Sequence, residues 1–262
     1  MRSLRMWQVD AFTQQVFAGN PAAVVLLESP LPDATLQAIA AENNLSETAF
    51  LVAQGHDYGI RWFTPTVEVD LCGHATLAAG YVVFEHLEPT RETVVFHSRS
   101  GPLTVHHDHA SERITLDFPA AACERVALED AVAQAVGVRP SETWQGRSLL
   151  ALFADEEQVR SLKPDFARVA SLPGFGLVAT APGRDCDFVS RYFVPQAGVN
   201  EDPVTGSTHS LLVPWWAVRV GRTSLTARQV SARGGWLWLE HRPPRVHIAG
   251  HAVEYMSATV EL

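Results

Sequence analysis

The sequence has few of the features that would set the protein apart from ordinary soluble chains. Its three cysteines are an odd number at long spacings. They indicate neither a disulfide framework nor a zinc pattern, and a reducing compartment suits them best. No signal-peptide core opens the chain, and no apolar run approaches the roughly 20 residues of a membrane-spanning helix. We therefore expect a cytoplasmic protein with no membrane partner.

Positive charge is also scarce, with 20 Lys and Arg against 29 Asp and Glu and a net charge of −9. Binding to a nucleic-acid backbone requires clustered Lys and Arg, so no nucleic-acid partner is expected. A small anionic substrate remains compatible with this balance, because backbone dipoles hold anions even inside acidic proteins. The glycine-rich dinucleotide motif, the Walker loop and the nucleophile elbow are absent as well.

The sequence does contain an internal repeat, over residues 61–76 and 191–209. Each copy reads as a strand, a proline turn, an acidic stretch, and a glycine that opens an apolar helix. A repeat of this length predicts two halves of one architecture, with a site in the cleft between them. The expected domains are residues 1–118, which the last strand (252–262) could rejoin, and residues 119–251.

The apolar helix of each copy shapes the expected fold. Residues 74–86 leave little polar face, so this helix should be buried all round, wrapped by its own sheet. Residues 208–220 form its counterpart, and Pro214 should kink that helix or shorten its start. Alternating polarity predicts a strand over 93–105 that pairs as a hairpin with another over 113–118.

The two glycines that open these helices, Gly73 and Gly206, are candidates for ligand contact. A helix N-terminus offers unpaired N–H groups and partial positive charge, and glycine lets a ligand approach the backbone. The alternative is that each glycine only permits a tight turn. Two copies, both preceded by acidic residues, favour a site for a carboxylate.

Three polar side chains are candidates for the chemistry. Glu47 falls where a helix ends and an apolar strand begins, and desolvation there would raise its pKa toward that of a general acid or base. Spacing alone favours an ordinary solvated glutamate. Asp202 precedes a proline and reads as a turn or cap, or as a group that contacts substrate or orients a base. His74 reads as a proton relay, or as a histidine that packs in the first turn.

A cysteine and a histidine run are candidates for other chemistry. Cys72 directly precedes a helix start, where a thiol can have a lowered pKa and act as a base; a small buried residue is at least as good an interpretation. The run His106–His109 suggests a metal, but it falls at a probable polar turn. No metal site is predicted.

Five ordered motifs closely resemble the phenazine-biosynthesis isomerase-like (PhzF-like) family, which is similar in fold to diaminopimelate epimerase. They are residues 9–12, 17–25, 45–50, 71–78 and 201–207. The resemblance implies an α+β fold of two pseudo-symmetric halves, each a curved mixed β-sheet wrapped around a central α-helix. It also implies proton transfer without a cofactor, in the cleft between the halves.

Residue by residue, the resemblance assigns roles on both sides of the repeat. Glu47 matches the family's acid/base glutamate, and His74 and Asp202 match supporting polar residues. Amides at Gly73, His74, Gly206 and Ser207 match the groups that hold the substrate carboxylate, and Asn20 borders the cleft. Cys72 lies near the first of the two cysteine bases of diaminopimelate epimerases, but residues 204–206 offer no second thiol. A two-thiol mechanism is therefore not expected. Where many relatives carry a Gln-Gly pair, this chain has Gln229 followed by Val230.

The sequence thus predicts a cofactor-independent isomerase or epimerase of biosynthetic type that moves a proton on a small carboxylate-bearing metabolite. The alternative is a module of the same fold that binds a metabolite or a protein without catalysis. A thiol enzyme dependent on Cys72 is a third hypothesis. A homodimer is compatible with the apolar second half.

Overall fold

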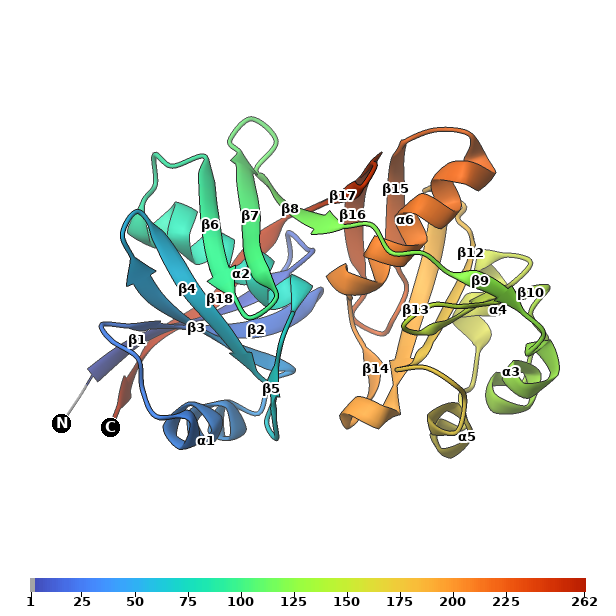
Figure 1. The fold of residues 1–262 in the computed structure, drawn as a ribbon, viewed down its shortest axis with the longest axis horizontal. Coiled ribbons are helices and arrows are strands. Elements are labelled where there is room, and N and C mark those ends of the chain that lie inside the picture. Colours follow the sequence, from blue (N-terminus) through green and yellow to red (C-terminus); the bar gives the residue numbers. More distant parts are fainter. Residues whose placement is uncertain (1–2) are drawn as a thin grey trace. The chain divides into compact units, whose positions relative to one another are not determined.

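The computed structural model describes residues 3–262, and the chain divides into two compact units (Figure 1). Unit 1 comprises the chain up to Phe118 together with residues 248–262, and unit 2 comprises residues 119–247. The chain therefore returns to unit 1 at residue 248, four residues before the predicted start of the last strand. Among residues 3–262, no helix combines the length and the apolar character needed to cross a membrane.

Unit 1 is built on one mixed sheet with the strand order β18-β1-β2-β3-β4-β6-β7-β8. The β2–β3 and β4–β6 pairs are parallel and the other pairs are antiparallel. A short β5 (Glu68–Val69) also pairs with β4. The strands span Ser3–Ala11 (β1), Asn20–Leu27 (β2), Glu47–Gln54 (β3), Asp57–Phe63 (β4), Thr93–Ser98 (β6), Gly101–Asp108 (β7), Arg113–Pro119 (β8) and Ala252–Glu261 (β18).

Unit 2 repeats this plan. From β10 to β16 its sheet pairs in the order β10-β11-β12-β13-β15-β16, with β11–β12 and β13–β15 parallel and a short β14 beside β13. The strands span Glu124–Val126 (β9), Glu142–Gln145 (β10), Leu149–Leu152 (β11), Leu177–Pro182 (β12), Phe188–Val194 (β13), Val199–Asp202 (β14), Ser224–Gln229 (β15), Gly235–Arg242 (β16) and Arg245–Gly250 (β17).

The two sheets share one sequence of antiparallel and parallel pairings. Strands β1 to β7 of unit 1 pair as β10 to β16 of unit 2 do. In each unit a helix follows the short strand, β5 or β14, and precedes the strand that pairs in parallel, β6 or β15. Two parallel neighbours need a crossover connection, and in both units helices form the crossovers of the two parallel pairs. The predicted α+β class with two pseudo-symmetric halves is confirmed.

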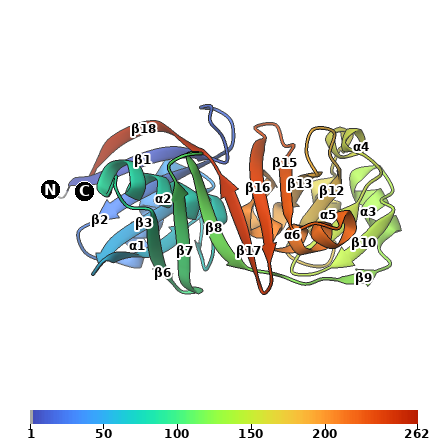
Figure 2. The ribbon, with the colours of Figure 1, turned by 90° about the horizontal axis from the view of Figure 1, so that it is seen from above.

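The central helix of unit 1 is α2 (Gly73–Val82), and it continues as one π-helical turn over Val83–Leu87. Of its ten residues only Tyr81 is not buried. It packs on β1, β2, β3 and β7, and Figure 2 shows β6, β7 and β8 running side by side beside it. A helix without a polar face is stable only when protein covers it all round, as the sequence predicted.

The corresponding helix of unit 2, α6 (Gly206–Val220), has Pro214 in its interior. The proline removes the hydrogen bond that would reach the carbonyl of Ser210, four residues earlier. That carbonyl instead accepts the backbone N–H of Ala121 at 2.9 Å. The helix begins at Gly206, so of the two predicted effects of Pro214, a kink or a shortened start, the shortened start is wrong.

Smaller helices cover the outer side of each sheet. In unit 1, α1 (Asp33–Asn43) buries Leu36, Ile39 and Ala40 in a second core with residues of β1, β2 and β3. In unit 2, α3 (Glu129–Val136), α4 (Glu156–Ser161) and α5 (Phe166–Ala170) share such a core with β11, β12 and β13. The sequence analysis did not find α4 and α5, which are too short to show a helical period.

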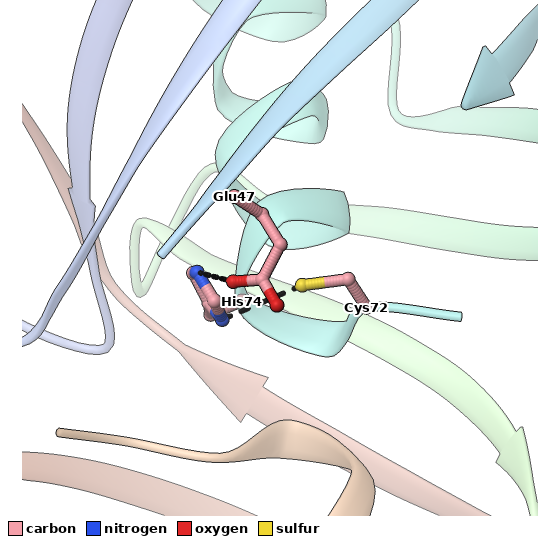
Figure 3. A group of neighbouring side chains, drawn as sticks. All are labelled: Glu47, Cys72 and His74. Atoms are coloured by element: carbon pink, nitrogen blue, oxygen red, sulfur yellow. Dashed lines mark hydrogen bonds and ion pairs between the residues drawn. The ribbon is translucent and has the colours of Figure 1, made fainter. Parts of the chain in front are cut away.

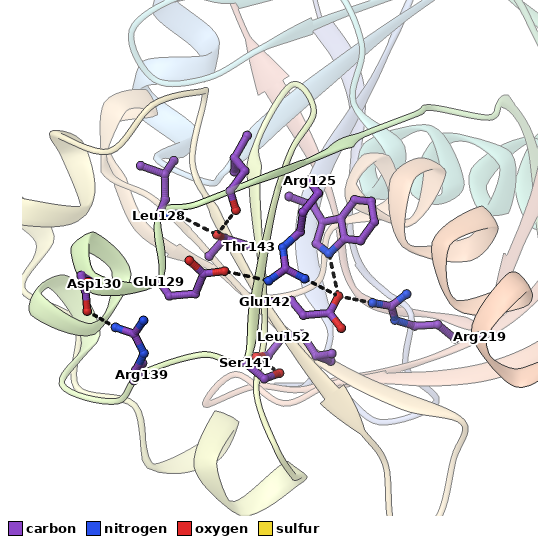
Figure 4. A network of polar contacts seen from close by, with 12 residues as sticks. Arg125, Leu128, Glu129, Asp130, Arg139, Ser141, Glu142, Thr143, Leu152 and Arg219 are labelled. Carbon is purple, nitrogen blue, oxygen red and sulfur yellow. Dashed lines mark hydrogen bonds and ion pairs between the residues drawn. The ribbon is translucent and has the colours of Figure 1, made fainter.

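A polar network surrounds Glu142 of β10 in the unit 2 sheet (Figure 4). The Glu142 carboxylate accepts a hydrogen bond from Trp144 at 2.8 Å and pairs with both Arg125 and Arg219. The Arg219 guanidinium also stacks 3.7 Å from the Trp215 ring centroid. This network ties β10 to α6 at the surface, and none of the predicted site residues takes part in it.

Candidate active site

Glu47 is the first residue of β3 and follows directly on the end of α1. Asn44 stops α1 in the left-handed conformation (φ 50°), and the Asn43 side chain donates to the Thr48 hydroxyl at 3.1 Å. Glu47 pairs in register with Ala22 of β2, and Asn20, which is fully buried, begins that strand two residues earlier. Glu47 and Asn20 therefore lie at the same end of the sheet.

Cys72 and His74 lie at the start of α2. Cys72 is the N-cap residue, and no side chain caps this helix end. The Cys72 carbonyl accepts bonds from the backbone and hydroxyl of Thr76. A helix end without a side-chain cap is the kind of place that can bind an anion through its first N–H groups.

The three side chains meet at this point (Figure 3). The Glu47 carboxylate lies 3.2 Å from Nε2 of His74, and the Cys72 sulfur lies 3.5 Å from Nδ1 of the same ring. The His74 side chain is 4% exposed and that of Glu47 18%. The structure thus brings Glu47 to two residues that lie at least 25 positions later in the sequence, Cys72 and His74 at the start of α2.

Burial sets the charge state of this group. Desolvation lowers the pKa of His74 to about 3, so the imidazole is neutral at pH 7. Its contact with Glu47 is therefore a contact between a carboxylate and a neutral ring rather than a pair of opposite charges. A neutral imidazole beside a carboxylate can orient a substrate and pass a proton, which matches the predicted supporting role.

The other predicted residues belong to unit 2 and surround the start of α6. Asp202 ends β14, and its carboxylate accepts the Thr205 hydroxyl. Gly206 is buried at the first position of the helix and Ser207 is half-buried at the second. Thr205 is an N-cap without a side-chain cap, as Cys72 is in unit 1. Both helix starts are thus built alike.

Two buried residues that the sequence analysis did not assign hold this loop. Gln229 accepts the Thr205 backbone N–H at 2.9 Å and donates to the Asp202 carbonyl at 2.7 Å. His209 donates from Nδ1 to the Thr205 carbonyl at 2.7 Å, and burial lowers its pKa to about 4. The repeat itself marked His209, but the sequence contained no sign that its ring bonds the helix cap.

Two glutamates of the repeat, Glu68 and Glu201, pair with arginines of the strands beside them. Glu68 accepts two hydrogen bonds from Arg61, both at 2.7 Å, and Glu201 accepts two from Arg191, both at 2.8 Å. These planar pairs join β4 to β5 and β13 to β14. Glu68 and Glu201 are thus engaged by arginines of the neighbouring strands, and the site at the two glycines stays a prediction.

A cavity of about 310 Å³ lies elsewhere in unit 1, on the outer side of the sheet beside α1. Its walls include Leu31, Leu36, Phe50 and Arg61. None of the predicted site residues lines it. The trio of Glu47, Cys72 and His74 is therefore selected by its chemistry rather than by the size of a cavity.

Comparison with known proteins agrees with this architecture. The family model described as phenazine biosynthesis-like protein matches residues 9–258. The chain is 50% identical, over 99% of both sequences, to a protein of Pseudomonas aeruginosa named as an uncharacterized isomerase. It is 37% identical to the human phenazine biosynthesis-like domain-containing protein, over 98% of this chain and 99% of that one.

Solved structures extend the comparison. A phenazine biosynthesis protein of the PhzF family from Enterococcus faecalis superposes with a TM-score of 0.97 at 46% identity, over the whole of both chains. A hydroxyproline epimerase from Agrobacterium vitis shares the fold alone, with a TM-score of 0.61 at 13% identity over 99% of this chain and 92% of that one. The curated relatives named as isomerases identify this chain as an isomerase, and the family model and the solved structures agree that it belongs to the phenazine biosynthesis-like protein family.

Proposed function

We propose that this isomerase moves a proton on a small carboxylate-bearing metabolite without a cofactor, and that Glu47 is its acid/base. One observation carries the proposal: the Glu47 carboxylate lies 3.2 Å from a buried, neutral imidazole at the uncapped start of α2. A proton acceptor, a polar partner and a helix N-terminus therefore occupy one small region. Proton transfer next to a carboxylate requires these three elements.

In the proposed reaction, the Glu47 carboxylate takes a proton from a carbon beside the substrate carboxylate or carbonyl. The electron pair of the broken C–H bond moves onto that group, and the first N–H groups of α2 stabilise the negative charge as it develops. Protonated Glu47 then returns the proton to the same carbon or to another one. His74 orients the substrate, and no oxidant or group donor is needed.

Unit 2 contributes the second half of the proposed site. Asp202 would contact a substrate amine or hydroxyl, and the amides of Gly206 and Ser207 would hold the carboxylate, with Asn20 at the border of the site. The matched helix starts of the two units support this assignment. That one substrate is held between the units stays a prediction, as do the homodimer and the cytoplasmic location.

The test is hydrogen exchange in D₂O. The full chain is incubated with a panel of amino acids and cyclic carboxylic acids, and deuterium uptake is measured by mass spectrometry. Glu47→Gln keeps the size and a polar tip but cannot take a proton, so uptake should fall by at least about a hundredfold. Glu42→Gln, on the exposed side of α1, is the matched control and should exchange as the unchanged protein does. Uptake that survives Glu47→Gln would refute the assignment.

The same experiment separates the other hypotheses. Saturable quenching of tryptophan fluorescence by a compound that never takes up deuterium would favour a module that binds without catalysis. A thiol mechanism predicts that Cys72→Ser abolishes exchange. The Cys72 sulfur lies 3.5 Å from His74, close enough to orient the ring. On the glutamate mechanism we expect Cys72→Ser to keep at least about a tenth of the exchange rate.

A further inference from the structure

We infer that Glu47, Cys72 and His74 bind a thiophilic divalent metal ion such as Zn²⁺, and that this ion blocks the acid/base. Each residue offers one ligand atom, and the three atoms lie within 4.8 Å of one another. Within residues 3–262 no other group of three His, Cys, Asp or Glu side chains meets this condition. The metal site itself depends only on these contacts, whereas the block rests on the proposed function.

The donor set fits zinc. Zn²⁺ prefers thiolate, imidazole and carboxylate ligands in a tetrahedral arrangement, with bonds of about 2.0 to 2.3 Å. Two such ligands on one tetrahedral ion are separated by about 3.4 to 3.6 Å. The Cys72 sulfur and His74 Nδ1 are 3.5 Å apart, so this edge of the tetrahedron already has the required length. The Glu47 ligand atom lies within 4.8 Å of the other two, so rotation of its side chain can bring it onto the ion.

The surroundings favour an ion over a chance cluster. The His74 side chain is 4% exposed, so an ion bound to its Nδ1 atom would be largely shielded from water. Glu47 is the most exposed of the three, at 18%, so an ion can enter on its side.

Charge balance is also met. On binding, the Cys72 thiol loses its proton to solvent and the sulfur bonds to the ion. The thiolate and the Glu47 carboxylate then match the two positive charges of Zn²⁺, and the imidazole adds none. Such a neutral complex avoids the large cost of an unpaired charge in a buried place. The fourth position of the tetrahedron is left to water.

Binding would stop the proposed reaction by a direct route. The carboxylate oxygen that takes the substrate proton becomes a metal ligand, and the ion occupies the space beside the first N–H groups of α2. Inhibition should therefore follow metal occupancy and be reversed by a chelator. This differs from catalytic zinc, which keeps the general base outside its ligand set.

The test uses the full chain with Co²⁺ or Cd²⁺ alone, followed by competition with Zn²⁺. Co²⁺ should give the strong visible bands of a tetrahedral site, and Cd²⁺ a thiolate charge-transfer band, each saturating at one ion per chain. Cys72→Ser should abolish the thiolate band, and Glu47→Gln and His74→Gln should weaken binding by at least about tenfold. Cys123→Ser and Cys186→Ser are the matched controls and should leave the spectra unchanged. Circular dichroism verifies that each variant is folded.

The outcomes are distinct. A thiolate band that persists in Cys72→Ser, or no saturable spectrum at all, overturns the metal site. If the ion saturates the trio while deuterium exchange continues at its full rate, the block is refuted. If the ion binds as described but the protein exchanges no substrate in its absence, the metal site stands and the proposed function fails.

Discussion

The buried histidine of unit 2 should make the protein sensitive to acid. His209 is fully buried on α6 and burial lowers its pKa to about 4, against an ordinary value of 6.5. Because the folded state holds the ring neutral, the unfolded chain binds a proton that the folded chain refuses between these two pH values. The free energy of unfolding is therefore not reduced by this residue above pH 6.5, and it decreases as the pH falls toward 4.

The size of the effect follows from the two pKa values. Each unit of difference corresponds to 1.36 kcal/mol, so the free energy of unfolding should fall by about 3 kcal/mol between pH 7 and pH 4 through this residue alone. That is a large share of the 5 to 15 kcal/mol that holds a typical domain together. Carboxylates titrate in the same range, so the comparison needs a variant that removes only the histidine.

His209→Asn provides that comparison. The asparagine N–H₂ can replace Nδ1 as the donor to the Thr205 carbonyl, which now lies 2.7 Å away, but it has no group that titrates. Urea unfolding at pH 7, 5.5 and 4 is followed by tryptophan fluorescence. Trp216 is a local reporter, because Phe188 stacks on both its ring and that of His209. The variant should lose about 3 kcal/mol less than the unchanged protein over this range.

A surface control sharpens the result. His56→Asn replaces an exposed histidine and should leave the pH dependence as it is in the unchanged protein. Equal slopes for the unchanged protein and His209→Asn would show that the ring is protonated in the folded state or reaches water. Either finding would refute the account of its burial.

Three further changes test the loop and strand geometry by urea unfolding. Gly19→Ala should destabilise unit 1 by about 2 kcal/mol or more, because a Cβ there would lie 2.2 Å from the Ala11 carbonyl at φ +63°. Gly55→Ala has the same φ with nothing within 4 Å, so it should cost about 1 kcal/mol, and equal losses would refute the steric argument. Glu201→Gln should cost about 1 to 3 kcal/mol by breaking the paired bonds to Arg191, and a double-mutant cycle with Arg191→Met should show coupling; additive losses would contradict it. Gln229→Leu should cost about 2 kcal/mol, because the Thr205 N–H loses its acceptor, and Gln229→Glu should recover part of that loss; a neutral Gln229→Leu would show that the loop does not need the clamp.

Periodicity revealed the central helices because their signal is local and strong. Residues 74–86 were predicted as a helix buried all round, and α2 with its π-helical turn covers 73–87. Residues 93–105 were predicted as one strand, but the chain turns at Ser98 and Gly101 and forms β6 and β7. Gly101 adopts φ +93° after the pair Arg99-Ser100. This pair lacks the Asn-Gly pattern that predicts a hairpin turn, so the sequence did not indicate the turn.

The site was predictable only in part, and for a physical reason. Motif resemblance pointed to Glu47, Cys72 and His74, but their meeting depends on how β3 begins beside the start of α2, which is a matter of tertiary packing. The clamp by Gln229 was invisible for the same reason, since it joins residues 24 or more positions apart. Which acidic residues are bound to arginines is likewise decided by strand register, not by spacing.

The two copies of the repeat carry different side chains at the start of their central helices. At the second position of each central helix unit 1 has His74 and unit 2 has Ser207, while at the fourth position unit 1 has Thr76 and unit 2 has His209. Thr76 and His209 do the same work, since each bonds the carbonyl of the N-cap residue before its helix. The histidine of unit 2 is thus engaged by its own backbone, and only that of unit 1 faces a carboxylate. Equal folds with unequal side chains at two helix positions would leave one unit to carry the proton and the other to hold the substrate.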